Sequence, residues 1–195
     1  MAKEVFSRLS KLLGIAVMGI FVLSGLSLAA EFSADYIHKM GEETITGKVY
    51  VKGDKVRQEM VKEGKKALMI IRMDKGIIWH FMPKERMYME MPSIKGHYTV
   101  VDKELEKIAT KKHLGREKVN GWDCDKYKII YHDKSMGTGI HWVSKKLNYP
   151  IKFEMKGASG FTVLTQYKNI KEQELPDSLF EIPADYKKMS MPGMF

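Results

Sequence analysis

The chain has 195 residues, a length typical of one domain, and carries a net charge of +9 at pH 7. Its single cysteine, Cys124, excludes an intrachain disulfide, an iron–sulfur cluster, an all-thiolate zinc site and haem attachment through two cysteines. No nucleic-acid recognition motif accompanies the positive charge, so nucleic acid is not an expected partner. The scattered lysines suit exposed sheet edges or contact with an anionic membrane surface.

The first 30 residues are typical of a secretory signal peptide. Three basic residues precede an uncharged run over residues 12–30, which ends in the small residues Ala29 and Ala30. Cleavage there predicts a periplasmic protein. The competing interpretation is a retained inner-membrane anchor, because an uncharged run of this length could just span a bilayer core of about 30 Å. We therefore divide the chain into a signal peptide over 1–30, a single β domain over 31–188 and a disordered methionine-rich tail over 189–195.

Alternating and apolar runs separated by turn residues predict a sheet in the rest of the chain. The first predicted strands cover 32–40, 44–52 and 55–62, and a meander of three short strands follows between 67 and 91, with turns at 74–76 and 83–85. After one helix, strands resume around the hairpin signal Asn120-Gly121. These later segments cover 116–119, 122–132, 140–145, 151–156 and 161–170, and one helical turn is expected at 176–180.

The predicted helix covers 101–112, where apolar residues recur at helical spacing between an N-cap candidate, Asp102, and a stop candidate, Gly115. Ten or eleven strands against one helix indicate a mainly β protein of the α+β class. We expect a strongly curved antiparallel sheet that forms an open, unclosed barrel, with one or more helices packed on its concave side.

Methionine is the outlier of the composition, with 15 residues, of which Met1 and Met18 lie in the first 30. In the third strand of the meander, Met87, Met89 and Met91 share one face, because side chains on a strand alternate. Flexible, polarisable thioethers suit an adaptable apolar surface such as an acyl-chain cavity, although an ordinary core can also use them as filler. The candidate cavity residues are Arg57, Met69, Ile71, Met73, Trp79, Phe81, Met87, Met89 and Met91.

Catalytic and metal motifs are scarce in this sequence. The six histidines show no i, i+2 or i, i+4 pair, and neither a Gly-rich phosphate loop nor a nucleophile elbow is present. Cys124 lies between Asp123 and Asp125, whose charges raise a thiol pKa and make it a poor nucleophile. The sequence therefore predicts a protein without catalytic residues or a cofactor.

Five segments together resemble an exported bacterial family of uncharacterised function. They read KGDKVRQE, MDKGIIWHFMPKERMYMEMP, VNGWDCDKYK, YPIKFEM and LPDSLFEIPADYKKM, in this order along the chain. That family is similar in fold to the outer-membrane lipoprotein carrier superfamily (LolA/LolB-like), a likeness carried here by the D-x-G-x-x-W-x-F pattern of Asp74, Gly76, Trp79 and Phe81. The resemblance implies an unclosed antiparallel barrel capped by helices, with an apolar cavity for acyl chains. It also implies that an arginine on an early strand, matched here by Arg57, holds the lid.

These observations predict a non-enzymatic periplasmic protein that binds a lipid or an acylated ligand in an apolar cavity. Two alternatives stay open. One is an envelope protein that binds Cu(I), since thioether sulfur is a soft ligand, through the strand methionines or through Met189, Met191 and Met194 of the tail. The other is a structural envelope module that binds a protein partner.

Overall fold

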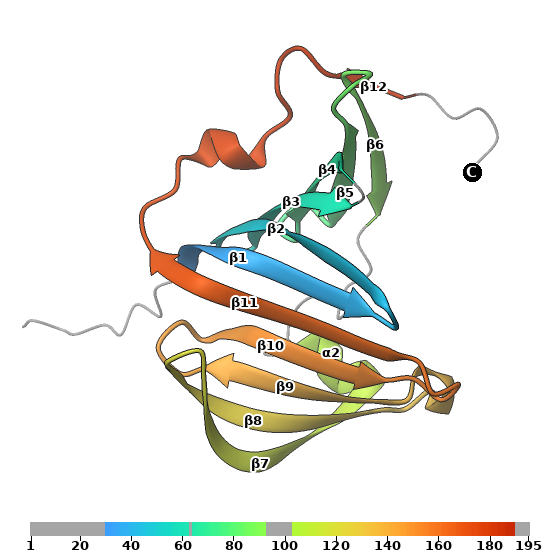
Figure 1. Cartoon of the computed structure of the whole chain (residues 1–195), viewed down its shortest axis with the longest axis vertical. Coiled ribbons are helices and arrows are strands. Elements are labelled where there is room, and N and C mark those ends of the chain that lie inside the picture. Colours follow the sequence, from blue (N-terminus) through green and yellow to red (C-terminus); the bar gives the residue numbers. More distant parts are fainter. Residues whose placement is uncertain (1–29, 63, 93–102, 190–195) are drawn as a thin grey trace, which may run out of the picture.

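The computed structural model describes residues 30–62, 64–92 and 103–189, and these form one sheet of twelve strands (Figure 1). The strand order is β12-β6-β5-β4-β3-β2-β1-β11-β10-β9-β8-β7, antiparallel throughout except for the parallel pair β12 and β6. In chain order the elements are β1 (Glu31–Met40), β2 (Glu43–Lys52), β3 (Lys55–Lys62), β4 (Lys65–Arg72), β5 (Ile77–Met82), β6 (Met87–Pro92), α2 (Lys103–Ile108), β7 (Ala109–Val119), β8 (Trp122–Tyr131), the 3-10 helix η1 (Lys134–Met136), β9 (Thr138–Ser144), β10 (Tyr149–Lys156), β11 (Thr162–Glu172), the 3-10 helix η2 (Asp177–Phe180) and β12 (Lys187–Lys188).

The sheet is curved but does not close. The early strand β1 and the late strand β11 pair in its middle, while β7 and β12 stand at its two edges. Figure 1 shows the half from β2 to β6 turning away from the half formed by β7 to β11. Buried side chains from both halves meet in one core, among them Phe32 on β1, Ile71 on β4 and Tyr167 on β11. The expected open, curved antiparallel sheet is therefore confirmed.

The helix is shorter than predicted. The structure ends α2 at Ile108, and residues 109–119 continue as strand β7, so the helical interpretation of 109–112 was wrong. The reason is tertiary: Ala109 stands opposite Tyr131 in the β7–β8 ladder, which satisfies the backbone groups that a longer helix would have paired internally. Leu105 on α2 packs with Ala109 and with Ile129 on β8, so the short helix lies against that hairpin.

Turn chemistry was predicted more accurately than helix length. Asn120 and Gly121, with φ of 50° and 86°, join β7 and β8 in the two-residue hairpin that this dipeptide favours. The helical turn expected at 176–180 is η2, which buries Phe180 completely. The twelfth strand, β12, escaped prediction because it has only two residues and depends on β6 for its pairing. The predicted signal peptide and most of the tail lie outside the described residues.

Candidate ligand-binding site

The sheet from β3 to β6 gathers methionines on one face. Directly opposite residues in an antiparallel ladder share a face, and the registers place Met69 opposite His80 and His80 opposite Met89. The neighbouring row joins Ile71, Ile78 and Met91 in the same way. We call this surface the methionine face and define it as Met60, Met69, Ile71, Ile78, His80, Met82, Met87, Met89 and Met91.

The methionine face belongs to the concave side of the sheet. Ile71 and Ile78 are part of the core that unites both halves of the molecule, and Met60, Met69 and Met73 pack against that core. Except for the fully buried Ile71 and Ile78 and the exposed Met91, the side chains of this face are half-buried. A half-buried methionine surface that continues from a closed core can take up further apolar material.

The opposite face of the same strands is already covered by the chain itself. Trp79 and Phe81 on β5 pack with Ile70 on β4 and with Leu175 and Phe180 of the C-terminal segment. Figure 1 shows this segment running from the end of β11 past β3 and β4 to β12. The predicted cavity set is thus divided between two faces: the methionines and Ile71 lie on one, and Trp79 and Phe81 on the other.

Arg57, the residue matched to the arginine that holds the lid in lipoprotein carriers, also lies on the covered face. Its Nη1 donates to the backbone oxygen of Leu179 at 3.1 Å, and its Nε donates to Glu59 at 2.8 Å. Arg57 therefore holds the C-terminal segment and does not line the methionine face. That any of the nine predicted residues contacts a ligand stays a prediction.

A second arginine, Arg72, which is not among the predicted residues, holds the same segment through more contacts than Arg57 does. The side chain of Arg72 is only 5% exposed; it donates to Asp74 at 2.7 and 2.8 Å, to the Phe180 backbone oxygen at 3.2 Å and to Glu181 at 2.5 Å. The hydrogen bonds from Arg72 hold the pKa of Asp74 below its usual range. The R-x-D spacing at the end of a predicted strand was the available signal, because it places both charges at one hairpin turn.

The half-buried His80 and the buried His141 differ in their surroundings. Burial lowers the pKa of His80, whose ring is half-buried on β5. Burial, helped by the charge of Lys111, lowers the pKa of His141 to about 4, and both of its ring nitrogens are buried without a partner. Both imidazoles are therefore neutral at pH 7.

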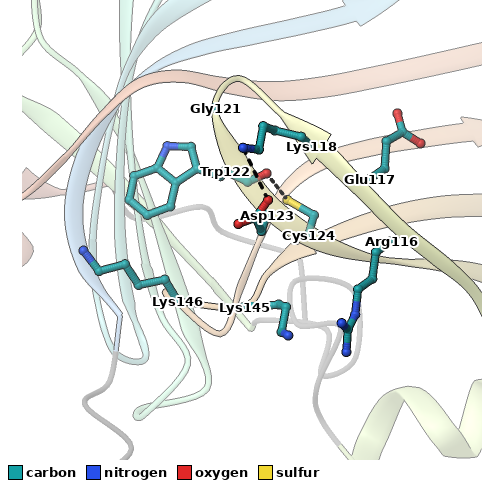
Figure 2. Close-up of a pocket in the computed structure, with 9 residues that line it drawn as sticks. All are labelled: Arg116, Glu117, Lys118, Gly121, Trp122, Asp123, Cys124, Lys145 and Lys146. Atoms are coloured by element: carbon teal, nitrogen blue, oxygen red, sulfur yellow. Dashed lines mark hydrogen bonds and ion pairs between the residues drawn. The ribbon is translucent and has the colours of Figure 1, made fainter.

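A cavity of about 790 Å³ lies at the tip of the β7–β8 hairpin (Figure 2). Figure 2 shows Lys118 bonded to Asp123, with Trp122 and Lys146 to one side and Cys124 between them and Arg116. Burial, helped by the two flanking aspartates, raises the pKa of Cys124 to about 11, the direction expected from the sequence, and the low reactivity of the thiol stays a prediction. Nine residues line the cavity, four of them basic and two acidic. They are Arg116, Glu117, Lys118, Gly121, Trp122, Asp123, Cys124, Lys145 and Lys146.

This hairpin-tip cavity suits an anionic group better than an apolar one. Glu117 already accepts from Lys126 at 2.8 Å, and Asp123 is paired with Lys118 at 3.7 Å. Four basic side chains line this cavity, and the membrane-surface contact expected from the net charge stays a prediction. A second cavity of about 490 Å³ lies at the far end of β9, β10 and β11; neither cavity includes a predicted ligand-binding residue.

The described residues contain neither a cluster of conventional metal ligands nor a membrane-spanning helix. In residues 30–62, 64–92 and 103–189, no group of three or more His, Cys, Asp or Glu side chains could hold a metal ion. Over these residues no helix has the length and apolar character needed to cross a bilayer. Met189 of the predicted tail site donates its backbone N–H to the Tyr88 oxygen at 2.8 Å, whereas Met191 and Met194 lie outside the described residues.

The fold and site define a β-rich protein of the open, unclosed-barrel class. The chain belongs to the DUF4412 family, a domain family of unknown function that matches residues 36–148. This confirms the resemblance to a family of uncharacterised function. No curated protein matches the chain.

Solved structures extend the likeness in fold. An uncharacterised conserved protein from Thermus thermophilus is 14% identical, with a TM-score of 0.60, 96% of this chain and 98% of that chain being covered. MucB in the MucA/MucB complex of Pseudomonas aeruginosa is 12% identical, with a TM-score of 0.54 over 85% of this chain and 60% of its own. A LolA superfamily protein from Nitrosomonas europaea is 13% identical, with a TM-score of 0.40 over 78% and 90% of the two chains. At these identities the likeness to the first two structures concerns the fold alone.

Proposed function

We propose that this protein is a non-enzymatic binding protein of the bacterial envelope, which holds the acyl chain of a lipid or acylated ligand against the methionine face. The observation that carries the proposal is the cross-strand continuity of that face. Its rows run across three neighbouring strands, β4 to β6, so thioether and aliphatic side chains, with the one imidazole of His80, cover an elongated surface. A band of this kind matches the shape of an extended hydrocarbon chain.

The chemistry of the methionine face supports a ligand without a fixed shape. Methionine has three rotatable bonds and a polarisable sulfur, so neighbouring methionines can adapt to chains of different length and unsaturation. Each buried methylene contributes about 0.8 kcal/mol. About ten methylenes would contribute about 8 kcal/mol, which is of the same order as the 4–15 kcal/mol lost on association. One short chain would therefore bind weakly, and we expect a long chain or more than one.

The envelope location rests on the sequence of residues 1–30, whose basic start, uncharged run and small-residue end are typical of a secretory signal peptide. A protein partner is the second candidate. It is favoured by the fold likeness to MucB, whose structure was solved in complex with MucA. If the partner is acylated, the two candidates share the methionine face. If it is not, it binds a surface that an acyl probe leaves free.

A fatty-acid binding assay tests the proposal. The protein is stripped of lipid and titrated with a fluorescent long-chain fatty acid, and the same titration is made on a variant with Met87→Ser, Met89→Ser and Met91→Ser. We expect saturable binding by the wild type and a loss of at least about tenfold in affinity, or about 1.4 kcal/mol, in the variant. Met136→Ser, on η1 in the other half of the molecule, is the matched control. A folded triple variant that binds the probe like the wild type would overturn the proposal.

A further inference from the structure

One row of the methionine face differs from the rest because it contains an imidazole. His80 on β5 stands between Met69 on β4 and Met89 on β6, each directly opposite it in its ladder. The adjacent rows carry aliphatic or thioether side chains at the β5 position, Ile78 and Met82. The His80 ring is half-buried, and its nitrogens are not among the buried polar atoms that lack a partner in the described residues, so a ligand on this face can reach them.

The distances within this row favour a shared ligand. Methionines that alternate along one strand, such as Met87 and Met89, have side chains about 7 Å apart, since a strand rises about 3.4 Å per residue. Residues directly opposite in antiparallel strands have Cβ atoms only about 4.5–5.5 Å apart. The thioether sulfurs of Met69 and Met89 can therefore approach the His80 ring from both sides through their flexible side chains. Because Met69, His80 and Met89 belong to three different strands, their spacing in the sequence does not reveal that they lie side by side.

We propose that Met69, His80 and Met89 form a binding site for a soft monovalent cation, Cu(I). Two thioethers and one neutral imidazole are soft or borderline ligands, and thioether sulfur selects Cu(I) over hard oxygen-seeking cations such as Mg²⁺ or Ca²⁺. The desolvated surroundings keep the imidazole neutral at pH 7, which leaves its nitrogen lone pair available. The site takes the ion already in its reduced state, so binding needs no electron transfer.

The site goes beyond the proposed function and shares its surface. Because Met69 and Met89 also belong to the methionine face, Cu(I) and an acyl chain compete for them. The two proposals fail separately: fatty-acid binding depends on the whole band of methionines, whereas Cu(I) binding depends on His80, which contributes little to apolar contact. His80→Gln tests Cu(I) binding without loss of a methionine, since it removes the imidazole ligand and keeps all the thioethers.

Methyl NMR with Ag(I), a redox-inert soft monovalent cation, locates the site in the full mature chain. We expect addition of Ag(I) to shift the ε-methyl signals of Met69 and Met89 and to leave that of Met82, the matched control on the same face and the same strand as His80, in place. A shift confined to Met189, Met191 and Met194 would overturn the proposal in favour of a tail site. The absence of any saturable shift would overturn it altogether.

Competition with a chromogenic Cu(I) chelator under anaerobic, reducing conditions gives the affinity. We expect His80→Gln, Met69→Leu and Met89→Leu each to weaken Cu(I) binding at least about tenfold, or about 1.4 kcal/mol, while Met82→Leu has no effect. Leucine preserves most of the volume of methionine, so these variants are expected to fold. If Met82→Leu weakens binding as much as Met69→Leu and Met89→Leu do, the methionine face binds soft ions diffusely and the three-residue site is refuted.

Discussion

Phe180→Ala tests whether the C-terminal segment is an integral part of the fold. Phe180 is fully buried in a cluster with Ile70, Trp79 and Phe81, whose exposures are 0%, 4% and 4%. Replacing a buried phenylalanine by alanine typically costs about 3–5 kcal/mol, because hydrocarbon is lost to water and a cavity is left behind. The upper half of this range is expected here, since the rigid strands on one side of the ring prevent the cluster from collapsing around the cavity.

Urea denaturation followed by tryptophan fluorescence measures the effect, and Trp79 within the same cluster reports on it. If the free energy of unfolding falls by about 2 kcal/mol per molar urea, a loss of about 4 kcal/mol lowers the urea midpoint by about 2 M. Ser178→Ala, an exposed residue two positions away on η2, is the control and should leave the midpoint unchanged. A loss below about 1 kcal/mol for Phe180→Ala would show that the segment is only loosely attached and that the covered face is free to bind.

Four further outcomes follow from local geometry. Gly47→Ala should prevent folding or cost several kcal/mol, measured by thermal denaturation, because a Cβ there would stand 1.8 Å from the backbone oxygen of Glu59. Asp74→Asn should destabilise the protein at pH 7 but not near pH 2: Arg72 lowers the pKa of the folded carboxylate, so its contribution is present above the unfolded pKa of about 3.9 and is lost as pH falls through the folded value. Cys124 should resist a thiol reagent at pH 8 until the protein is unfolded, and rapid native labelling would contradict its burial. Asn120→Ala should cost about 1–3 kcal/mol by urea denaturation, because the Asn120 amide donates to the Tyr167 oxygen at 2.8 Å from a backbone with positive φ.

The strands and hairpins were predictable because their signals are local. Alternation along residues 44–52 corresponds to the half-buried and exposed pattern of β2, and the Asn120-Gly121 turn determines how β7 and β8 pair. The end of the helix was not predictable from the same kind of signal. Residues 109–112 continue the helical spacing, and only the ladder with β8, about twenty residues away in sequence, turns them into a strand.

At the candidate site, too, the sequence predicted what one strand determines by itself and not what depends on how strands pair. Alternation placed Met87, Met89 and Met91 together, as the structure does. It could not decide how β4, β5 and β6 are aligned, and that alignment puts His80 between two methionines and sends Trp79 and Phe81 to the other face. The contact of Arg72 with the C-terminal segment could not be predicted either, because it depends on tertiary structure. Its partners include Phe180 and Glu181, more than a hundred residues away in the sequence.

Native mass spectrometry shows directly whether the methionine face holds acyl chains. The mature protein is purified gently from the periplasm of an expression host and compared with the Met87→Ser, Met89→Ser, Met91→Ser variant. We expect adducts of heterogeneous lipid mass on the wild type and their loss from the folded variant. A bare wild-type mass, or identical lipid adducts on both proteins, would contradict the proposed function.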